Sequence, residues 1–103
     1  MAAFRFSLRA EADLVEIARY TLQHWGVAQT TRYIGDLEAC CRQLADAPEL
    51  GRPCGYIRPG LRRLERGRHV IFYRPEPDGI LVSRILHRSM LPERYPIEDS
   101  GEA

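Results

Sequence analysis

The residues best suited to chemistry in this sequence are arginines and one histidine in its second half. All 15 basic residues are arginine, and nine of them lie between Arg52 and Arg88. Arginine stays protonated and its planar guanidinium pairs with carboxylates and phosphates, so it stabilises charge but is a poor general base. His87 ends an apolar run, just before Arg88. A histidine there could exchange a proton during phosphodiester cleavage. Packing, or contact with a partner, is the other role open to it.

The remaining chemistry-bearing residues do not form a recognisable enzyme or metal site. The sequence contains no glycine-rich phosphate loop, no Gly-x-Ser-x-Gly and no His-Glu-x-x-His motif. Cys40, Cys41 and Cys54 are odd in number and two are adjacent, so they predict buried, reduced thiols and not a disulfide framework. His24 and His69 lack the spacing of metal ligands. We therefore expect no catalytic residue, no metal and no cofactor.

The bulk composition is that of one ordinary globular domain. The chain has 103 residues, 45% of them apolar, and a net charge of +1. No apolar stretch approaches the ~18 residues of a membrane span, and the N-terminus lacks a signal-peptide pattern, so we expect a cytoplasmic protein without a membrane partner. The small net charge predicts only indirect contact with nucleic acid. We expect a single domain over residues 1–96 and a mobile tail over residues 97–103.

The first half of the chain predicts one strand and a helical hairpin. Apolar and polar residues alternate over residues 4–8, which indicates a half-buried strand. Helical spacing of apolar residues runs over residues 10–25 and again over about 28–47. Gly26 lies between the two helical segments and ends the first. So short a connection makes the two helices antiparallel neighbours.

The second half predicts a sheet. A loop rich in proline and glycine over residues 48–60 leads to strands at 61–65, 68–74 and 80–87, the last two joined through an Asp-Gly turn. The order β-α-α-β-β-β predicts an α+β fold in which the helical hairpin packs on one face of a mainly antiparallel sheet.

Both faces of the last two predicted strands carry apolar side chains. Strict alternation places Val70, Phe72, Ile80, Val82 and Leu86 on one face, and Ile71, Tyr73, Leu81 and Ile85 on the other. Two helices cover only one side of a sheet. We therefore expect the other side to be partly apolar and exposed, as a surface for another polypeptide. A C-terminal tail that folds back over that side is the alternative.

A series of short motifs runs through the chain in a fixed order. They are SLRAEADL at 7–14 with YTLQHWG at 20–26, YIGDLE at 33–38, LADAPELGRP at 44–53, RPGLRRL at 58–64, GRHVIFYR at 67–74, and ILHRSM at 85–90 with PER at 92–94. Each is a weak signal alone, but the ordered series is specific. Over about residues 4–95 the chain resembles the ParE group of the RelE/ParE toxin–antitoxin superfamily.

This resemblance implies a function as well as a fold. Toxins of the ParE group are encoded beside a ParD-like antitoxin, whose disordered arm wraps the toxin, and they inhibit DNA gyrase. Their RelE relatives cleave mRNA on the ribosome. The motifs follow ParE and the chain has no lysine, so we expect a gyrase inhibitor that is not an enzyme. A RelE-like ribonuclease, or a non-toxic homologue that only binds an antitoxin, is the alternative.

Two sets of site residues follow as predictions. The first set faces the target, gyrase, and comes from the basic strands and the segment after them: Arg63, Arg84, His87, Arg88, Met90 and Arg94. The second set is expected to be exposed on the sheet and the second helix, where the antitoxin would bind: Tyr33, Leu37, Ile71, Tyr73, Leu81 and Ile85.

Overall fold

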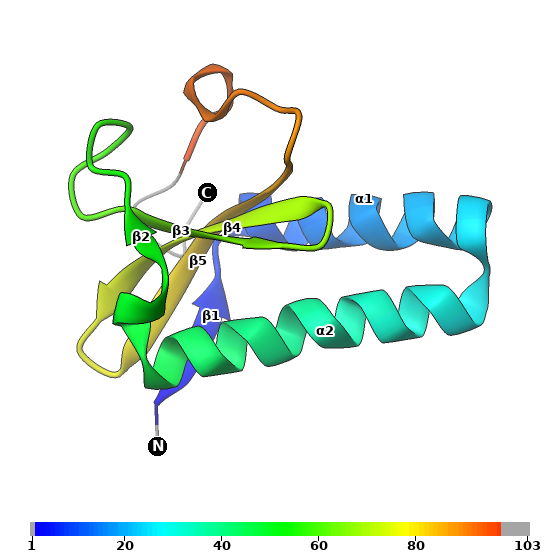
Figure 1. The fold of residues 1–103 in the computed structure, drawn as a ribbon, viewed down its shortest axis with the longest axis horizontal. Coiled ribbons are helices and arrows are strands. Elements are labelled where there is room, and N and C mark those ends of the chain that lie inside the picture. The colour runs from blue at the N-terminus through cyan, green and yellow to red at the C-terminus, as the bar shows by residue number, and fades with distance from the viewer. Residues whose placement is uncertain (1, 98–103) are drawn as a thin grey trace.

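The structure, a computed structural model, describes residues 2–97 and consists of a five-stranded sheet with a helical hairpin against it (Figure 1). The strands are β1 (Ala3–Phe6), β2 (Arg52–Pro53), β3 (Arg62–Arg66), β4 (His69–Glu76) and β5 (Gly79–His87). Their order is β1-β5-β4-β3-β2, with β1 parallel to β5 and the other neighbours antiparallel. The predicted α+β fold is confirmed. The short strand β2 was not predicted, because it lies within the turn-rich loop.

Two helices form the second layer. Helix α1 spans Leu8–Trp25 and helix α2 spans Val27–Asp46. Ser7 starts α1 as its N-cap, because its Oγ accepts a hydrogen bond from the Ala10 N–H at 3.0 Å. Gly26 separates the helices with a φ of 86°, a left-handed conformation that glycine adopts without strain. Figure 1 shows the closed end of this hairpin projecting beyond the sheet.

The main core lies between the hairpin and the sheet. An apolar stripe on α2 is buried there, including Leu37, Cys40 and Leu44, and α1 contributes Ile17. From the sheet, the side chains of this cluster are Ile71, Tyr73, Ile80, Val82 and Ile85. Each fully buried aliphatic side chain of this size stabilises the fold by roughly 1.5–3 kcal/mol relative to exposure.

A β-bulge changes which strand residues share a face. Phe72 pairs with Arg84 but Tyr73 pairs with Val82, so Ser83 is an extra residue on β5. Val82 and Ile85 therefore point to the same side although they are three positions apart. The faces predicted from strict alternation are wrong for this reason: Ile80 and Val82 share the helix-covered face with Ile71.

The sheet face away from the hairpin is also covered. A second cluster of buried side chains lies there and consists of Cys54, Leu61, Val70, Phe72, Leu86 and Ile97. The expectation of a bare apolar sheet face is therefore wrong, because the loop before β3 and the end of the described chain fold over it. Of the predicted tail, Ile97 is described and only 5% exposed; residues 98–103 lie outside the described residues. Neither helix of the described chain is long and apolar enough to cross a membrane.

Candidate partner-binding groove

An open cavity of about 750 Å³ lies between α1, the turn that joins β3 to β4, and the segment after β5. We call it the α1 groove. Its lining residues are Asp13, Glu16, Ile17, Tyr20, Thr21 and Trp25 from α1, Gln29 and Tyr33 from α2, Gly67 and Arg68 from the turn, His69 from the start of β4, and Arg84, Ile85, Leu86, His87, Ser89 and Met90 from the end of β5 and beyond. The closed end of the hairpin, which supplies Trp25 and Gln29 to this lining, projects beyond the sheet (Figure 1).

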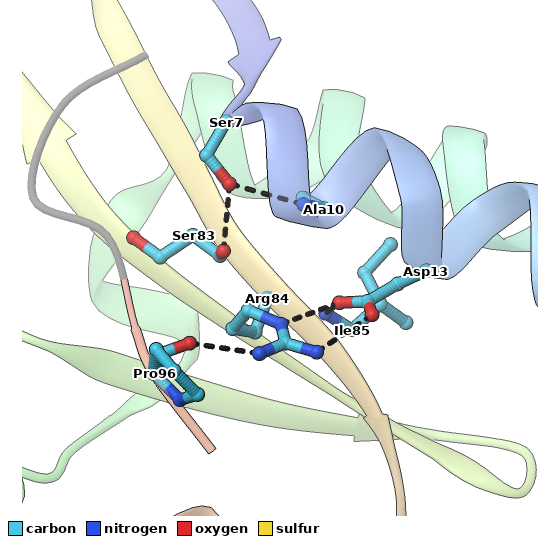
Figure 2. A network of polar contacts seen from close by, with 7 residues as sticks. All are labelled: Ser7, Ala10, Asp13, Ser83, Arg84, Ile85 and Pro96. Carbon is cyan, nitrogen blue, oxygen red and sulfur yellow. Dashed lines mark hydrogen bonds and ion pairs between the residues drawn. The ribbon is translucent and has the colours of Figure 1, made fainter. Parts of the chain in front are cut away.

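A buried ion pair forms the floor of the groove (Figure 2). Arg84 of β5 donates from Nε and Nη2 to the two carboxylate oxygens of Asp13 on α1, both at 2.8 Å. The Ile85 N–H donates to the same carboxylate at 2.9 Å, and Arg84 Nη1 donates to the Pro96 carbonyl at 2.8 Å. The side chains of Arg84 and Asp13 are only 10% and 14% exposed. This bidentate pair joins α1, the bulged strand and the end of the described chain.

The start of α1 is tied to the same strand. Ser7 Oγ donates to the Ser83 carbonyl at 2.8 Å while it accepts the Ala10 N–H, as Figure 2 shows. The bulge at Ser83 turns that carbonyl out of the strand ladder and leaves it free to accept. Asp13 lies on α1 beyond this attachment, so the position of its carboxylate over Arg84 follows from how Ser7 anchors the helix.

The turn between β3 and β4 forms one wall, and Tyr33 of α2 holds it in place. The Tyr33 hydroxyl accepts the Arg68 N–H at 3.0 Å and lies 2.6 Å from His69 Nδ1. The same hydroxyl lies 3.4 Å from the Arg66 carbonyl, a second acceptor for its proton, so its role toward His69 Nδ1 depends on the histidine tautomer. Gly67 lies against the Tyr33 ring in a left-handed conformation with φ of 59°, so a side chain at this position would collide with the ring and push Tyr33 away from the turn.

The titratable groups of this wall are held in their neutral forms. Burial lowers the pKa of His69 from 6.5 to about 4, and the positive charges of His87 and Arg68 add to the effect. Burial also raises the pKa of Tyr33 above its usual value. His87, whose ring is 5.5 Å from that of His69, is exposed and has its Nδ1 2.8 Å from Ser89 Oγ.

The rim of the groove is apolar and open to water. Tyr20 and Trp25 on α1 are 54% and 56% exposed, and Met90 across the groove is 40% exposed. The Arg68 guanidinium lies 5.2 Å from the centre of the Trp25 ring. Tyr20 stacks on His24 one turn later, with ring centres 4.0 Å apart. Large apolar side chains grouped around a cavity are typical of a binding surface.

Three of the six predicted target-facing residues line this groove. They are Arg84, His87 and Met90. His87 and Met90 are exposed, as expected. Arg84 is not, since it is only 9% exposed and its guanidinium is bound to Asp13. In this conformation Arg84 therefore lies below the groove and connects β5 to α1, and its contact with a target stays a prediction.

The other three target-facing candidates lie outside the groove lining. Arg88 is beside it, with its Nη1 3.3 Å from the Gly67 carbonyl. Arg63 lies on the opposite face of the sheet, where its guanidinium is 5.3 Å from the Phe72 ring centre. Its Nε is buried without a hydrogen-bond partner among the described residues. Arg94 is exposed on the short turn Pro92–Arg94.

The predicted antitoxin-binding residues are mostly core residues. Leu37, Ile71, Tyr73, Leu81 and Ile85 are each at most 2% exposed. The expectation that these side chains are exposed is wrong: Leu37, Ile71, Tyr73 and Ile85 belong to the core between the hairpin and the sheet, and Leu81 is also buried. Their contact with an antitoxin stays a prediction. Tyr33, the sixth candidate, is half-buried and lines the groove.

Sequence reasoning did not assign Asp13, Tyr20, Trp25, Arg68 or His69 to a binding site. A signal was present for two of them. Tyr20 is off the buried stripe of α1, and Trp25 lies at its end, so both are large side chains that the core does not need. Asp13 carried no such signal, because its partner Arg84 is 71 positions away.

Metal and thiol chemistry find no support in the described part of the chain. Within residues 2–97 no group of three His, Cys, Asp or Glu side chains is placed to hold a metal ion. The predicted free thiols are confirmed, since Cys40, Cys41 and Cys54 are buried and unbonded. Burial raises the pKa of all three thiols, that of Cys41 to about 12, which keeps them protonated near neutral pH.

Comparisons with known proteins agree with the motifs. A family model described as the ParE toxin of the type II toxin–antitoxin system parDE matches residues 4–92. Toxin ParE1 of Caulobacter vibrioides is 42% identical over 92 residues, which cover 87% of this chain and 93% of that protein. Toxin ParE1 of Mycobacterium tuberculosis is 39% identical over 92 residues, covering 88% of this chain and 94% of that one.

Solved structures show the same fold. A structure of the chromosomal ParDE TA system from P. aeruginosa superposes with a TM-score of 0.70 at 22% identity, covering 84% of this chain and 96% of that one. At that identity the likeness speaks for the fold alone. The family match and the relatives together establish that the chain belongs to the ParE toxin family of type II toxin–antitoxin systems.

Proposed function

We propose that this chain is the toxin of a type II toxin–antitoxin pair, that it inhibits DNA gyrase by binding, and that a ParD-like antitoxin neutralises it by placing an arm in the α1 groove. The relatives named as toxins align with this chain over nearly their whole length, which supports the toxin role. The observation that carries the antitoxin part is the groove itself, a cavity of about 750 Å³ with exposed aromatic side chains on its rim.

The groove suits a row of apolar side chains from an arm that folds on binding. Ile17 lines the bottom, while Tyr20, Trp25 and Met90 stand around the opening. Aromatic residues and methionine are enriched among side chains that carry binding energy at interfaces, and methionine adapts its shape to a partner. A disordered segment laid along such a groove as an amphipathic helix would place its apolar residues inside.

The rim is positively charged beside the β3–β4 turn. Arg66 and Arg68 flank that turn and Arg88 adjoins it, and all three are exposed. An arm with acidic residues beside its apolar row would bring carboxylates to these guanidinium groups. Exposed charges of this kind act mainly on the association rate, so the rate of complex formation should fall with added salt.

Binding accounts better than catalysis for the groups around the groove. His69 has a pKa of about 4 and shares a hydrogen bond with Tyr33, so neither is poised to move a proton near neutral pH. Arg84 is held by Asp13 below the surface. The groove therefore presents shape and charge to a partner, and burial keeps His69 and Tyr33 neutral near neutral pH.

The gyrase proposal is tested with purified chain, gyrase and relaxed plasmid. We expect supercoiling to be inhibited. The amount of the chain needed for full inhibition should rise in proportion to the gyrase concentration, because each copy of a binding inhibitor is held in a complex with its target. A catalytic toxin would instead inactivate many target molecules per copy. Undiminished supercoiling at a large molar excess of the chain would exclude gyrase as the target and leave the antitoxin proposal standing.

A ribonuclease remains the second candidate because of one observation: His87 and Ser89 are exposed on the groove rim with 2.8 Å between Nδ1 and Oγ. Primer extension on mRNA from cells that express the chain separates the two functions. We expect no ribosome-dependent cuts. Cuts that vanish in His87→Ala would favour the ribonuclease.

A further inference from the structure

The second apolar cluster of the sheet is closed by the end of the described chain. Residues 88–97, which we call the strap, leave β5, make a wide loop and return to the sheet (Figure 1). The side chain of Ile97 is 5% exposed and lies in the cluster with Cys54 and Phe72. The strap thus covers the face that the helices leave open, and it does so through its far end.

Two anchors hold that far end. One is Ile97 itself, and the other is the Pro96 carbonyl, which accepts a hydrogen bond from Arg84 Nη1 at 2.8 Å (Figure 2). The Arg84 guanidinium also lies 5.9 Å from the centre of the Tyr95 ring. Arg84 is in turn oriented by Asp13 of α1, so the strap is attached to the floor of the α1 groove.

The middle of the strap makes few buried contacts. Met90 and Leu91 are 40% and 55% exposed. Its backbone hydrogen bonds are short-range turns, such as Tyr95 N–H to the Pro92 carbonyl at 3.2 Å and Met90 N–H to the His87 carbonyl at 2.9 Å. A segment with few buried contacts and local hydrogen bonds opens at a lower free energy than the whole fold.

We infer that the strap is a latch: it lifts off the sheet while the helices and strands stay folded, and the Asp13–Arg84 pair sets how often it lifts. Lifting removes Ile97 from the second cluster and exposes the apolar face formed by Val70, Phe72 and Leu86. The main core on the other side of the sheet is untouched, since the strap contributes no side chain to it. This inference does not depend on the proposed toxin function and is tested without a partner.

The three cysteines report on the two faces separately. Cys54 lies in the strap-covered cluster, whereas Cys40 and Cys41 lie under the hairpin in the main core.

The purified chain is treated with N-ethylmaleimide near neutral pH, and the modification of each cysteine is followed by peptide mass spectrometry. Each rate is divided by the rate of the same cysteine in the urea-unfolded chain. We expect Cys54 to react at least about tenfold faster than Cys41, because the latch opens below the free energy of global unfolding. Equal rates at all three positions would overturn the latch.

Variants in the strap sharpen the test. Ile97→Ala removes the apolar anchor and should speed Cys54 modification at least about tenfold. Because the same contact is also lost on global unfolding, Cys41 should speed up by no more than the same factor and stay the slower of the two. Leu91→Ala is the matched control in the same strap, and because Leu91 is 55% exposed it should change neither rate. Ile97→Val is a milder change that keeps the fold and should give a smaller acceleration in the same direction. No rise at Cys54 in Ile97→Ala, or equal rates of Cys54 and Cys41 in that variant, would show that Ile97 is released only by global unfolding and not by a latch.

The Arg84 anchor is tested with Asp13→Asn. Loss of the carboxylate charge leaves Arg84 less firmly oriented toward Pro96, so the Cys54 modification rate itself should rise at least threefold. Cys54 should stay faster than Cys41, which shows that it is still reached through the latch and not through global unfolding. An unchanged Cys54 rate would show that the strap is independent of the groove floor and would overturn the coupling.

Discussion

The buried pair Asp13–Arg84 should be the most sensitive polar contact in the described chain. Removing Asp13 leaves a guanidinium that is only 10% exposed without its bidentate partner and deprives the Ile85 N–H of its acceptor. Breaking a buried pair from one side costs about 3–5 kcal/mol, and an unsatisfied buried N–H costs about 1–3 kcal/mol. Because the two losses overlap at one carboxylate, we expect Asp13→Leu to lower the free energy of unfolding by about 4 kcal/mol.

Replacing both partners should cost much less than the two single changes combined. Arg84→Met alone leaves the Asp13 carboxylate buried and should lower the free energy of unfolding by about 3 kcal/mol. In the double variant Asp13→Leu with Arg84→Met no charge remains to be compensated. The double variant should therefore be more stable than the sum of the singles predicts, by about 2–3 kcal/mol.

Urea unfolding followed by circular dichroism measures all four proteins of this cycle. The matched control is Arg19→Met with Glu16→Leu, an exposed pair on α1 at 2.8 Å whose removal should change stability by less than about 1 kcal/mol. Additive effects of Asp13→Leu and Arg84→Met, within about 0.5 kcal/mol, would refute the account of a coupled floor under the groove.

Three further outcomes follow from the structure. Acid should destabilise the fold between pH 6.5 and about 4, because His69 is protonated in the unfolded state at the higher pH and in the folded state only at the lower one. After allowance for partial exposure, the free energy of unfolding should fall by about 1–2 kcal/mol over this range. In urea unfolding, a His69→Gln variant should show a weaker dependence of that free energy on pH. Tyr73→Phe should cost about 1–3 kcal/mol, since the hydroxyl donates to the Pro48 carbonyl and accepts the Gly51 N–H at 2.9 Å; stability unchanged from the parent chain would contradict it. Gly79→Ala should lower the melting temperature because a Cβ there would strike the Ala3 backbone, whereas Gly35→Ala in α2, where a Cβ meets nothing within 4 Å, should raise it; shifts of the same sign would count against the geometry.

The local part of the fold was readable from the sequence. Helical spacing of apolar residues over about 28–47 predicts the second helix, and Gly26 predicts its separation from the first helix. The strands other than β2 were equally clear, since alternating and β-branched runs are separated by turns. Such signals depend on residues a few positions apart, which one sequence displays directly.

The contacts that build the groove were not readable in this way. One extra residue at Ser83 reverses the side on which the start of β5 presents its side chains, and nothing in the local pattern marks that position. The Asp13–Arg84 pair spans 71 positions, so it depends on how α1 lies over β5. The second apolar cluster likewise depends on Ile97 returning to the sheet, and it is why the expected bare face is closed.

The central claim, that the α1 groove receives an antitoxin arm, is tested most directly by isothermal titration with the ParD-like antitoxin that we propose as its partner. Trp25 and Tyr56 are both aromatic and are 56% and 76% exposed, but of the two only Trp25 lines the groove. We predict that Trp25→Ala raises the Kd at least about tenfold, as loss of an aromatic anchor does, and that Tyr56→Ala changes the Kd less than about twofold. Equal affinities of the two variants, with both shown to be folded by circular dichroism, would contradict the claim.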